Sequence, residues 1–101
     1  MKILFERSGG FAGLKMSTTI DMDSLPEEEA EKLHDLLDEA DFFELPELIQ
    51  PARPVPDEFT YLITVEGEGR RHTVRTSDSA ASDELRMLLN DLAFRARQRR
   101  V

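Results

Sequence analysis

Histidine and cysteine, the usual ligands of zinc, are scarce in this sequence. Histidine occurs only at His34 and His72, and cysteine is absent. A zinc site needs three or four ligands gathered at one point, and no HExxH pair is present. The run Asp21–Asp23 begins like a calcium-binding loop, but such a loop requires glycine at its sixth position and glutamate at its twelfth. These positions hold Pro26 and Lys32, so we expect no metal site.

The sequence also offers no set of side chains for nucleophilic catalysis. Without cysteine the nucleophile would be a serine, yet the serines near the predicted helix starts and turns are explained as caps or turn residues: Ser24, Ser77, Ser79 and Ser82. Carboxylates are frequent between residues 27 and 44, where a run of charge is typical of a solvated helix face. We therefore expect no catalytic residue, no cofactor and no enzymatic activity.

The most distinctive motif is the loop sequence Arg7-Ser8-Gly9-Gly10-Phe11-Ala12-Gly13. A phosphate-binding loop leads from a strand into a helix N-terminus, whose amides hold the anion. This motif instead lies between two strand-like runs, and no lysine follows in the required place. Its glycines permit a tight bend and the close approach of another backbone. Phe11 therefore either packs on its own core or contacts a partner, and the residue pattern leaves both interpretations open.

The first half of the chain predicts two strands and a helix. Residues 2–7 and 14–21 alternate in the manner of strands with one buried face, and the glycine-rich connector between them predicts an antiparallel hairpin. The run Ser24-Leu25-Pro26-Glu27 predicts a helix start with a capping box. We expect this helix to end near Phe43, with an apolar stripe at three- and four-residue spacing: Leu33, Leu36, Leu37, Ala40 and Phe43.

The second half repeats this order after a proline-rich segment. Residues 46–57 contain four of the chain's five prolines and predict an extended surface crossover. Residues 59–65 and 70–76 predict a second hairpin around the turn Gly67–Gly69. The serines between positions 77 and 82 supply N-caps for a last helix. Its apolar stripe consists of Leu85, Leu88, Leu89, Leu92 and Ala96.

These elements together predict the fold class. Their order is ββαββα, and two hairpins can pair into a four-stranded antiparallel sheet with both helices on one face. We therefore expect an α+β fold, a two-layer sandwich. A chain of 101 residues has the length of one domain, so we expect residues 1–101 to form a single domain.

Charge and apolar patterning narrow the choice of partners. The net charge of −8 divides unevenly: residues 1–68 hold 5 basic and 17 acidic side chains, and residues 69–101 hold 8 basic and 4 acidic ones. The acidic balance disfavours nucleic acid, whose binding requires Lys and Arg to neutralise phosphates. No apolar run approaches the roughly 20 residues that span a bilayer, and the N-terminus lacks the apolar region of a signal peptide. We expect a cytoplasmic protein, monomeric when free, that binds neither nucleic acid nor membrane.

Several runs of residues resemble the emfourin family. The match covers almost the whole chain, and its most specific part is Ser8–Gly13 within the run Ile3–Gly13. The other similar positions are Thr19-Ile20-Asp21, Ser24-Leu25-Pro26, Ala40-Asp41-Phe42-Phe43, Tyr61, Thr64-Val65, His72-Thr73-Val74, Asp83-Glu84-Leu85-Arg86 and Leu88-Leu89. Emfourins are small protein inhibitors of thermolysin-like zinc metallopeptidases, typically encoded beside a protealysin-like enzyme in bacteria. The resemblance therefore implies an inhibitor whose partner is a thermolysin-like (protealysin-like) metallopeptidase.

An inhibitor of this kind needs a preorganised projection that fills a cleft at little entropic cost. The glycine motif, held by a hairpin, supplies one, and the expected target-binding residues are Ser8, Gly9, Gly10, Phe11, Ala12, Gly13 and Leu14. The resemblance implies a target that favours large apolar side chains, so Phe11 or Leu14 is the candidate anchor.

Two alternatives stay open beside this assignment. Residues 46–58 are either a second contact surface, stiffened by their prolines, or a plain connector. The alternative function, from another class, is a non-inhibitory protein–protein interaction module that binds through its sheet edge or its acidic helix.

Overall fold

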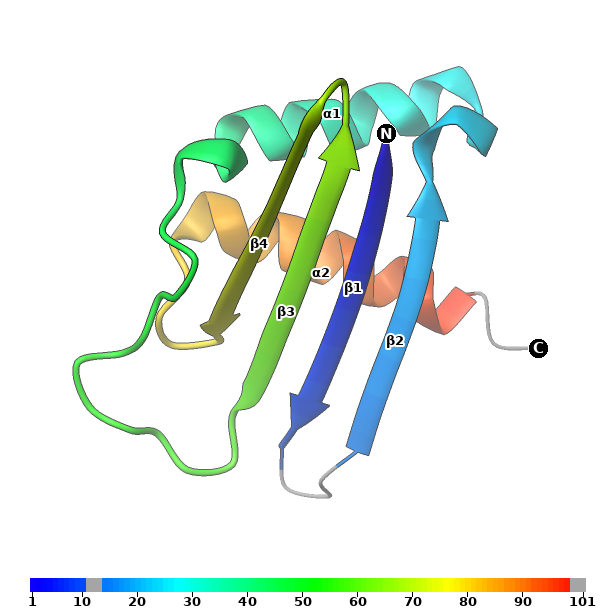
Figure 1. The fold of residues 1–101 in the computed structure, drawn as a ribbon. Helices are drawn as coiled ribbons and strands as arrows, with labels where there is room; N and C mark the ends of the chain where they lie inside the picture. Colours follow the sequence, from blue (N-terminus) through cyan, green and yellow to red (C-terminus); the bar gives the residue numbers. More distant parts are fainter. Residues whose placement is uncertain (11–13, 99–101) are drawn as a thin grey trace.

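The computed structural model describes residues 1–10 and 14–98 of the chain (Figure 1). The described elements follow the predicted order, with two short 3-10 turns in addition. Their bounds are β1 Lys2–Gly9, β2 Leu14–Asp21, η1 Met22–Ser24, α1 Glu27–Glu39, η2 Phe42–Glu44, β3 Phe59–Gly67, β4 Arg70–Ser77 and α2 Asp83–Gln98.

The four strands form one antiparallel sheet in the order β2–β1–β3–β4. Both predicted hairpins are present, and their strands β1 and β3 pair with each other at the centre of the sheet. In this register Ile3 lies between Ile20 and Val65. Figure 1 shows α1 and α2 on the same side of the sheet. The predicted α+β fold with the order ββαββα is therefore confirmed.

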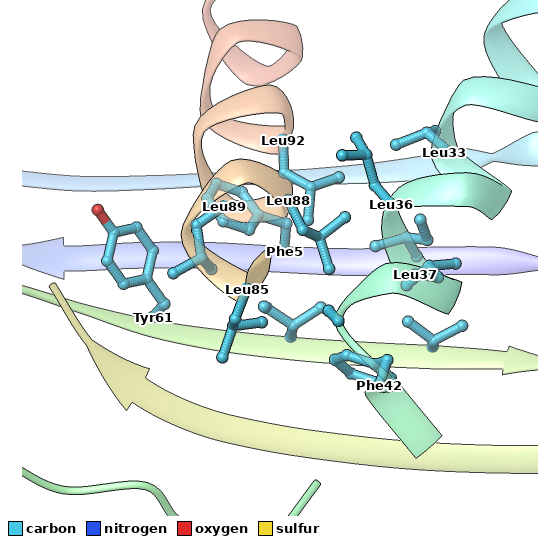
Figure 2. Packing of buried hydrophobic residues seen from close by; sticks show 14 of the residues in the cluster. Phe5, Leu33, Leu36, Leu37, Phe42, Tyr61, Leu85, Leu88, Leu89 and Leu92 are labelled. Atoms are coloured by element: carbon cyan, nitrogen blue, oxygen red, sulfur yellow. The ribbon is translucent and has the colours of Figure 1, made fainter. Parts of the chain in front are cut away.

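The core lies between the sheet and the two helices, as Figure 2 shows. Side chains along the strands alternate between the two faces of the sheet. Phe5, Ile63 and Val74 lie on the buried face and are at most 2% exposed. They pack in one cluster with the leucines of the two helix stripes: Leu33, Leu36, Leu37, Leu85, Leu88, Leu89 and Leu92. Burying one such leucine contributes about 2 kcal/mol, so the stripes hold the helices on the sheet. No helix of the described residues is long and apolar enough to cross a membrane.

The start of α1 differs from the capping box expected at Ser24. Pro26 is the N-cap residue and makes no side-chain cap hydrogen bond. Ser24 instead ends the turn η1, and its hydroxyl donates to the Asp21 carboxylate at 3.2 Å. The same carboxylate accepts the N–H of Asp23 at 3.1 Å. The turn therefore uses Ser24 before the helix begins, and the capping-box prediction is wrong.

The helix α1 also ends before the predicted Phe43. Asp41 has a left-handed φ of 53°, which interrupts the helix, and residues 42–44 form η2. This turn buries Phe42, which is 1% exposed. Phe43 is only partly buried, and the Arg70 guanidinium lies 4.0 Å from its ring centroid. A helical spacing rule cannot anticipate this change, because a left-handed residue rotates the positions that follow it.

The proline-rich crossover runs along the surface as predicted, and its first part pairs with the outer edge of β4. The Ile49 N–H donates to the Arg75 carbonyl at 2.9 Å, and the Arg75 N–H donates to the Glu47 carbonyl at 2.8 Å. These bonds occupy backbone groups at the edge of a sheet, where unpaired groups favour aggregation. The crossover therefore protects one edge of the sheet.

Candidate functional site

The described residues of the predicted target-binding set lie where β1 ends and β2 begins, at one end of the sheet. Ser8 and Gly9 end β1, Gly10 follows them, and Leu14 begins β2. Gly9 and Leu14 are partners in the strand register, so the hairpin ladder holds both ends of the connection. Three predicted residues lie outside the described part of the chain, and their roles stay predictions: Phe11, Ala12 and Gly13.

Two glycines at this end adopt a conformation that other residues rarely adopt. Gly9 and Gly10 have φ values of 91° and 75°, in the left-handed region that favours glycine. A Cβ atom on Gly10 would lie only 2.7 Å from Cε1 of Phe59. At Gly10 the close neighbour is therefore a side chain of the chain's own β3. The backbone approach expected of the glycine motif occurs at Gly9, where a Cβ atom would lie 3.2 Å from the Glu58 carbonyl oxygen.

Phe59, the first residue of β3, packs beside the end of β1. Gly9 is its partner in the register, and the Gly10 N–H donates to the Glu58 carbonyl at 3.3 Å. The Arg7 guanidinium lies 4.2 Å from the Phe59 ring centroid, which is a cation–π contact. Sequence reasoning placed Phe59 in a strand and missed its contact with Gly10, because no local pattern reports a neighbour so distant in the chain.

Asp78, in the turn after β4, fixes the beginning of β3. Its carboxylate accepts the Phe59 N–H at 3.1 Å and the Tyr61 hydroxyl at 2.6 Å. The Asp78 N–H in return donates to the Phe59 carbonyl at 3.3 Å. Burial, followed by the hydrogen bond to Asp78, raises the pKa of Tyr61 to about 12. Tyr61 therefore stays protonated at neutral pH and serves as a donor to the carboxylate.

Glu58, the residue before Phe59, binds Ser79, the residue after Asp78. Its carboxylate accepts the backbone N–H of Ser79 at 3.0 Å and the Ser79 hydroxyl at 2.9 Å. The Ser79 backbone N–H is the main cause that lowers the pKa of Glu58, since it stabilises the charged form. We call the paired residues Glu58, Phe59, Asp78 and Ser79 the crossover clamp.

Ser82 lies outside this clamp. Its hydroxyl oxygen accepts the Leu85 N–H at 3.1 Å and caps α2, as the sequence predicts.

The two histidines have separate surroundings. His72 Nε2 donates to the Leu45 carbonyl at 2.7 Å, and its ring meets that of Phe42 edge-on at 5.7 Å between centroids. His34 is exposed on α1. Among the residues that the structure describes, no three His, Asp or Glu side chains are grouped to hold a metal ion. His72 therefore has a structural role, joining β4 to the chain after η2.

The crossover and the end of the first hairpin lie at the same end of the sheet. Figure 1 shows residues 50–58 extending past the same end of the sheet at which β1 ends and β2 begins. The crossover clamp and the Gly10–Glu58 hydrogen bond join these parts of the chain. The described residues at the end of β1 and at the end of the crossover are therefore fixed on the sheet, and segments positioned by a rigid scaffold commonly carry binding residues.

A comparison with protein-family models gives a match over most of the chain. The family model described as Emfourin matches residues 5–93 of the 101-residue chain. No curated protein and no solved structure matches the chain.

Proposed function

Because the chain belongs to the emfourin family, we propose that it is a reversible, stoichiometric protein inhibitor of a thermolysin-family zinc metallopeptidase. It binds over the catalytic cleft of the peptidase and excludes the substrate, and it supplies no catalytic group of its own. The observation that carries this proposal is the family match over residues 5–93, which includes the glycine motif.

The supports around the glycine motif favour tight binding. Association costs the free energy of ordering flexible groups, and fixed residues beside a binding segment avoid part of this cost. Gly9 and Gly10 are held by the β1–β2 ladder, by the Glu58 carbonyl and by the Phe59 ring. Residues 8–14 are therefore proposed as the segment that enters the cleft, with Phe11 or Leu14 as its apolar anchor.

Titration of a peptidase with the purified chain tests the inhibitor proposal. We expect the activity of thermolysin, or of a protealysin-like enzyme, to fall in proportion to added chain until a stoichiometric end point. The peptidase activity should return when the complex is diluted, because the complex is reversible. Full peptidase activity in the presence of excess folded chain would refute the proposal.

Replacement of the proposed anchor separates its two possible roles. We expect Phe11→Ala to weaken inhibition by roughly thirtyfold, about 2 kcal/mol, as loss of an interface hot spot does. The melting temperature should change little. Phe94→Ala on α2, where Phe94 is 53% exposed, is the matched control and should inhibit like the wild type. A loss of about 3 to 5 kcal/mol in the stability of Phe11→Ala would instead place Phe11 in the core.

The alternative function is a non-inhibitory interaction module. The observation that favours it is the sheet face opposite the helices, where Leu4 and Leu62 line a hollow of about 250 Å³ and Leu4 is 37% exposed. A partner bound on this face would be sensitive to Leu4→Ser and insensitive to Phe11→Ala. Recovery of such a partner from native cells, with no effect of the chain on any peptidase, would favour this alternative.

A further inference from the structure

The strand β2 forms one edge of the sheet (Figure 1). Among the residues that the structure describes, β2 pairs with β1 and with no other strand. The opposite edge, β4, is covered in part by the backbone hydrogen bonds of Glu47 and Ile49 with Arg75. An edge strand presents a row of backbone donors and acceptors that can pair with another chain. The outer side of β2 is therefore the candidate surface for a further strand.

Backbone geometry limits how two copies of β2 can pair. The Met22 N–H donates to the Met1 carbonyl at 2.9 Å, so even-numbered residues of β2 point their backbone groups toward β1 and odd-numbered residues point them outward. The register with β1 is unbroken over the whole of β2, and the strand contains no proline. In an antiparallel pair, outward groups must face outward groups. Two copies therefore pair only in registers in which the numbers of facing residues add to an even sum.

One of these registers brings complementary side chains together. When Thr18 faces Thr18 of a second copy, Lys15 faces Asp21 and Met16 faces Ile20. The two-fold symmetry repeats both pairs, so each chain contributes the lysine of one charge pair and the aspartate of the other. Opposite charges that face each other across antiparallel strands attract. A shift of the register by two residues, in either direction, separates Lys15 from Asp21.

Both charged side chains keep their present partners in this arrangement. Lys15 Nζ lies 3.3 Å from the Glu6 carboxylate, and a lysine ammonium has three donors. The Asp21 carboxylate accepts the Asp23 N–H and the Ser24 hydroxyl, and its two oxygens have further lone pairs. A charge on an edge strand normally discourages pairing. Here the facing charge has the opposite sign, so the edge is attractive to its own copy.

The helix side of the same edge offers an apolar complement. A hollow of about 260 Å³ opens between the helices and β2, and the apolar residues that line it are Ile20, Leu25 and Phe94. Phe94 is 53% exposed. Met16 and Ile20 both pack on the helix side of the sheet, so Met16 of the second copy would extend toward this hollow from its place opposite Ile20. A methionine side chain is suited to such a site, because it is flexible and fills irregular gaps.

We propose that two copies of this chain associate through β2, antiparallel and with Thr18 on the two-fold axis, and so join their four-stranded sheets into one. The charge pair and the apolar pair arise together only when the chain meets its own sequence, which identifies the partner as a second copy. The dyad places the first hairpins of the two copies at opposite ends of the joined sheet. The free monomer expected from the sequence is then one state of an equilibrium. This inference does not rest on the proposed inhibitory function.

The mass in solution tests the association. By sedimentation equilibrium we expect the mass of the wild type to rise with concentration from that of one chain, 11.6 kDa, toward twice that value. Lys15→Glu should raise the dissociation constant of the dimer by about tenfold or more, because two attractive charge pairs become repulsive. Lys15→Arg keeps the charge and should associate like the wild type.

Arg71→Glu is the matched control for Lys15→Glu. Arg71 lies on β4, is 69% exposed where Lys15 is 66% exposed, and likewise pairs with a glutamate, Glu66. Its reversal changes the net charge of the chain by the same amount at the other edge of the sheet. Arg71→Glu should therefore associate like the wild type. Circular dichroism spectra of all these variants should match the wild type, because the replaced side chains are exposed.

Introduced cysteines test the register. The chain contains no cysteine, so a single introduced one forms disulfides only between chains. Thr18 faces itself as a non-hydrogen-bonded pair, in which the Cα atoms are about 4.5 Å apart, within the range of a disulfide. Thr18→Cys should therefore give a covalent dimer on mild oxidation. Met16→Cys should stay a single chain under the same conditions, because its two copies would lie about 13 Å apart along the strands.

Three results would overturn the inference. A wild type that keeps the mass of one chain at every concentration would do so, and would leave the β2 edge to a strand of another protein. Equal association of the wild type and Lys15→Glu would show that the contact lies elsewhere. Equal cross-linking of Thr18→Cys and Met16→Cys would exclude the register. None of these measurements uses a peptidase, so their outcome is distinct from that of the inhibition experiment.

Discussion

Gly10 owes its identity to a contact inside the protein as well as to any partner. Its φ of 75° disfavours a side chain, and a Cβ atom there would meet the Phe59 ring at 2.7 Å. Gly69 offers a comparison, because it has a similar φ of 77° with no atom within 4 Å of the position of a Cβ. Comparing substitutions at Gly10 and Gly69 therefore separates the cost of backbone strain from the cost of steric crowding.

We expect Gly10→Ala to destabilise the protein more than Gly69→Ala. Left-handed backbone costs a residue with a side chain about 1 to 2 kcal/mol in both variants. Gly10→Ala must also displace the Phe59 ring, which adds about 1 kcal/mol of lost packing. Urea unfolding measures both losses. Equal losses would mean that the Phe59 ring moves aside at no cost.

Tyr61 links the stability of the fold to alkaline pH. Its pKa rises from 10.0 to about 12 on folding, so its contribution to stability is complete below pH 10 and is lost as the pH rises through 12. A difference of this size corresponds to a loss on the order of 2 kcal/mol. We expect the free energy of unfolding of the wild type to fall more steeply over this range than that of Tyr61→Phe.

The same variant has a second expected effect at neutral pH. Tyr61→Phe removes the donor at 2.6 Å from the Asp78 carboxylate, and a hydrogen bond to a charged group contributes about 1.5 to 3 kcal/mol. Chemical unfolding at pH 7 and pH 11 measures both effects. Parallel pH profiles for the two proteins would show that Tyr61 has the same pKa in the folded and unfolded states.

At the scale of elements, α2 joins the sheet through one face only. Leu88 is fully buried against the sheet, whereas its neighbour Met87 is 57% exposed. Arg95 further ties α2 to α1, with 3.2 Å between its guanidinium and the Glu29 carboxylate. Its second ion pair, at 2.7 Å with Asp91, lies within α2. The apolar stripe nevertheless contributes most of the free energy that holds α2 in place, because ion pairs near the surface contribute about 1 kcal/mol or less.

Adjacent substitutions in α2 test this distribution. We expect Leu88→Ala to cost about 2 to 5 kcal/mol, since it leaves a cavity in the core. Met87→Ala should stay within about 0.5 kcal/mol of the wild type. Both variants keep good helix formers, so the comparison isolates burial. Similar losses at both positions, measured by urea unfolding, would contradict the observed packing.

At the scale of the whole molecule, one core joins both hairpins and both helices. The buried cluster takes residues from every strand and from α1 and α2. Pairing of β1 with β3 places the first hairpin against the second. Neither ββα half therefore has a core of its own.

We expect the protein to unfold in a single cooperative transition for this reason. Far-ultraviolet circular dichroism reports the helices, and the fluorescence of Tyr61, the chain's single tyrosine, reports the environment of β3. The two signals should give the same midpoint in urea. Two separate midpoints would show that the halves unfold independently.

Much of the fold follows from local patterns in the sequence. Alternation in residues 59–65 predicts β3, and the spacing of Leu85, Leu88, Leu89 and Leu92 predicts the buried face of α2, because burial selects apolar residues at the period of each element. The predictions fail where the backbone leaves these periods. Asp41 is left-handed, so η2 buries Phe42 in place of Phe43.

At the candidate site too, local patterns predict some features of the glycine motif and miss others. Its residue types by themselves identified a bend, excluded a phosphate-binding loop and resembled those of the family. Only the tertiary structure brings Gly10 to Phe59, Phe59 to Asp78 and Glu58 to Ser79. These partners are far apart in the chain and meet because β1, β3 and β4 lie side by side. Strand order is set by the shared core, and no local pattern reports it.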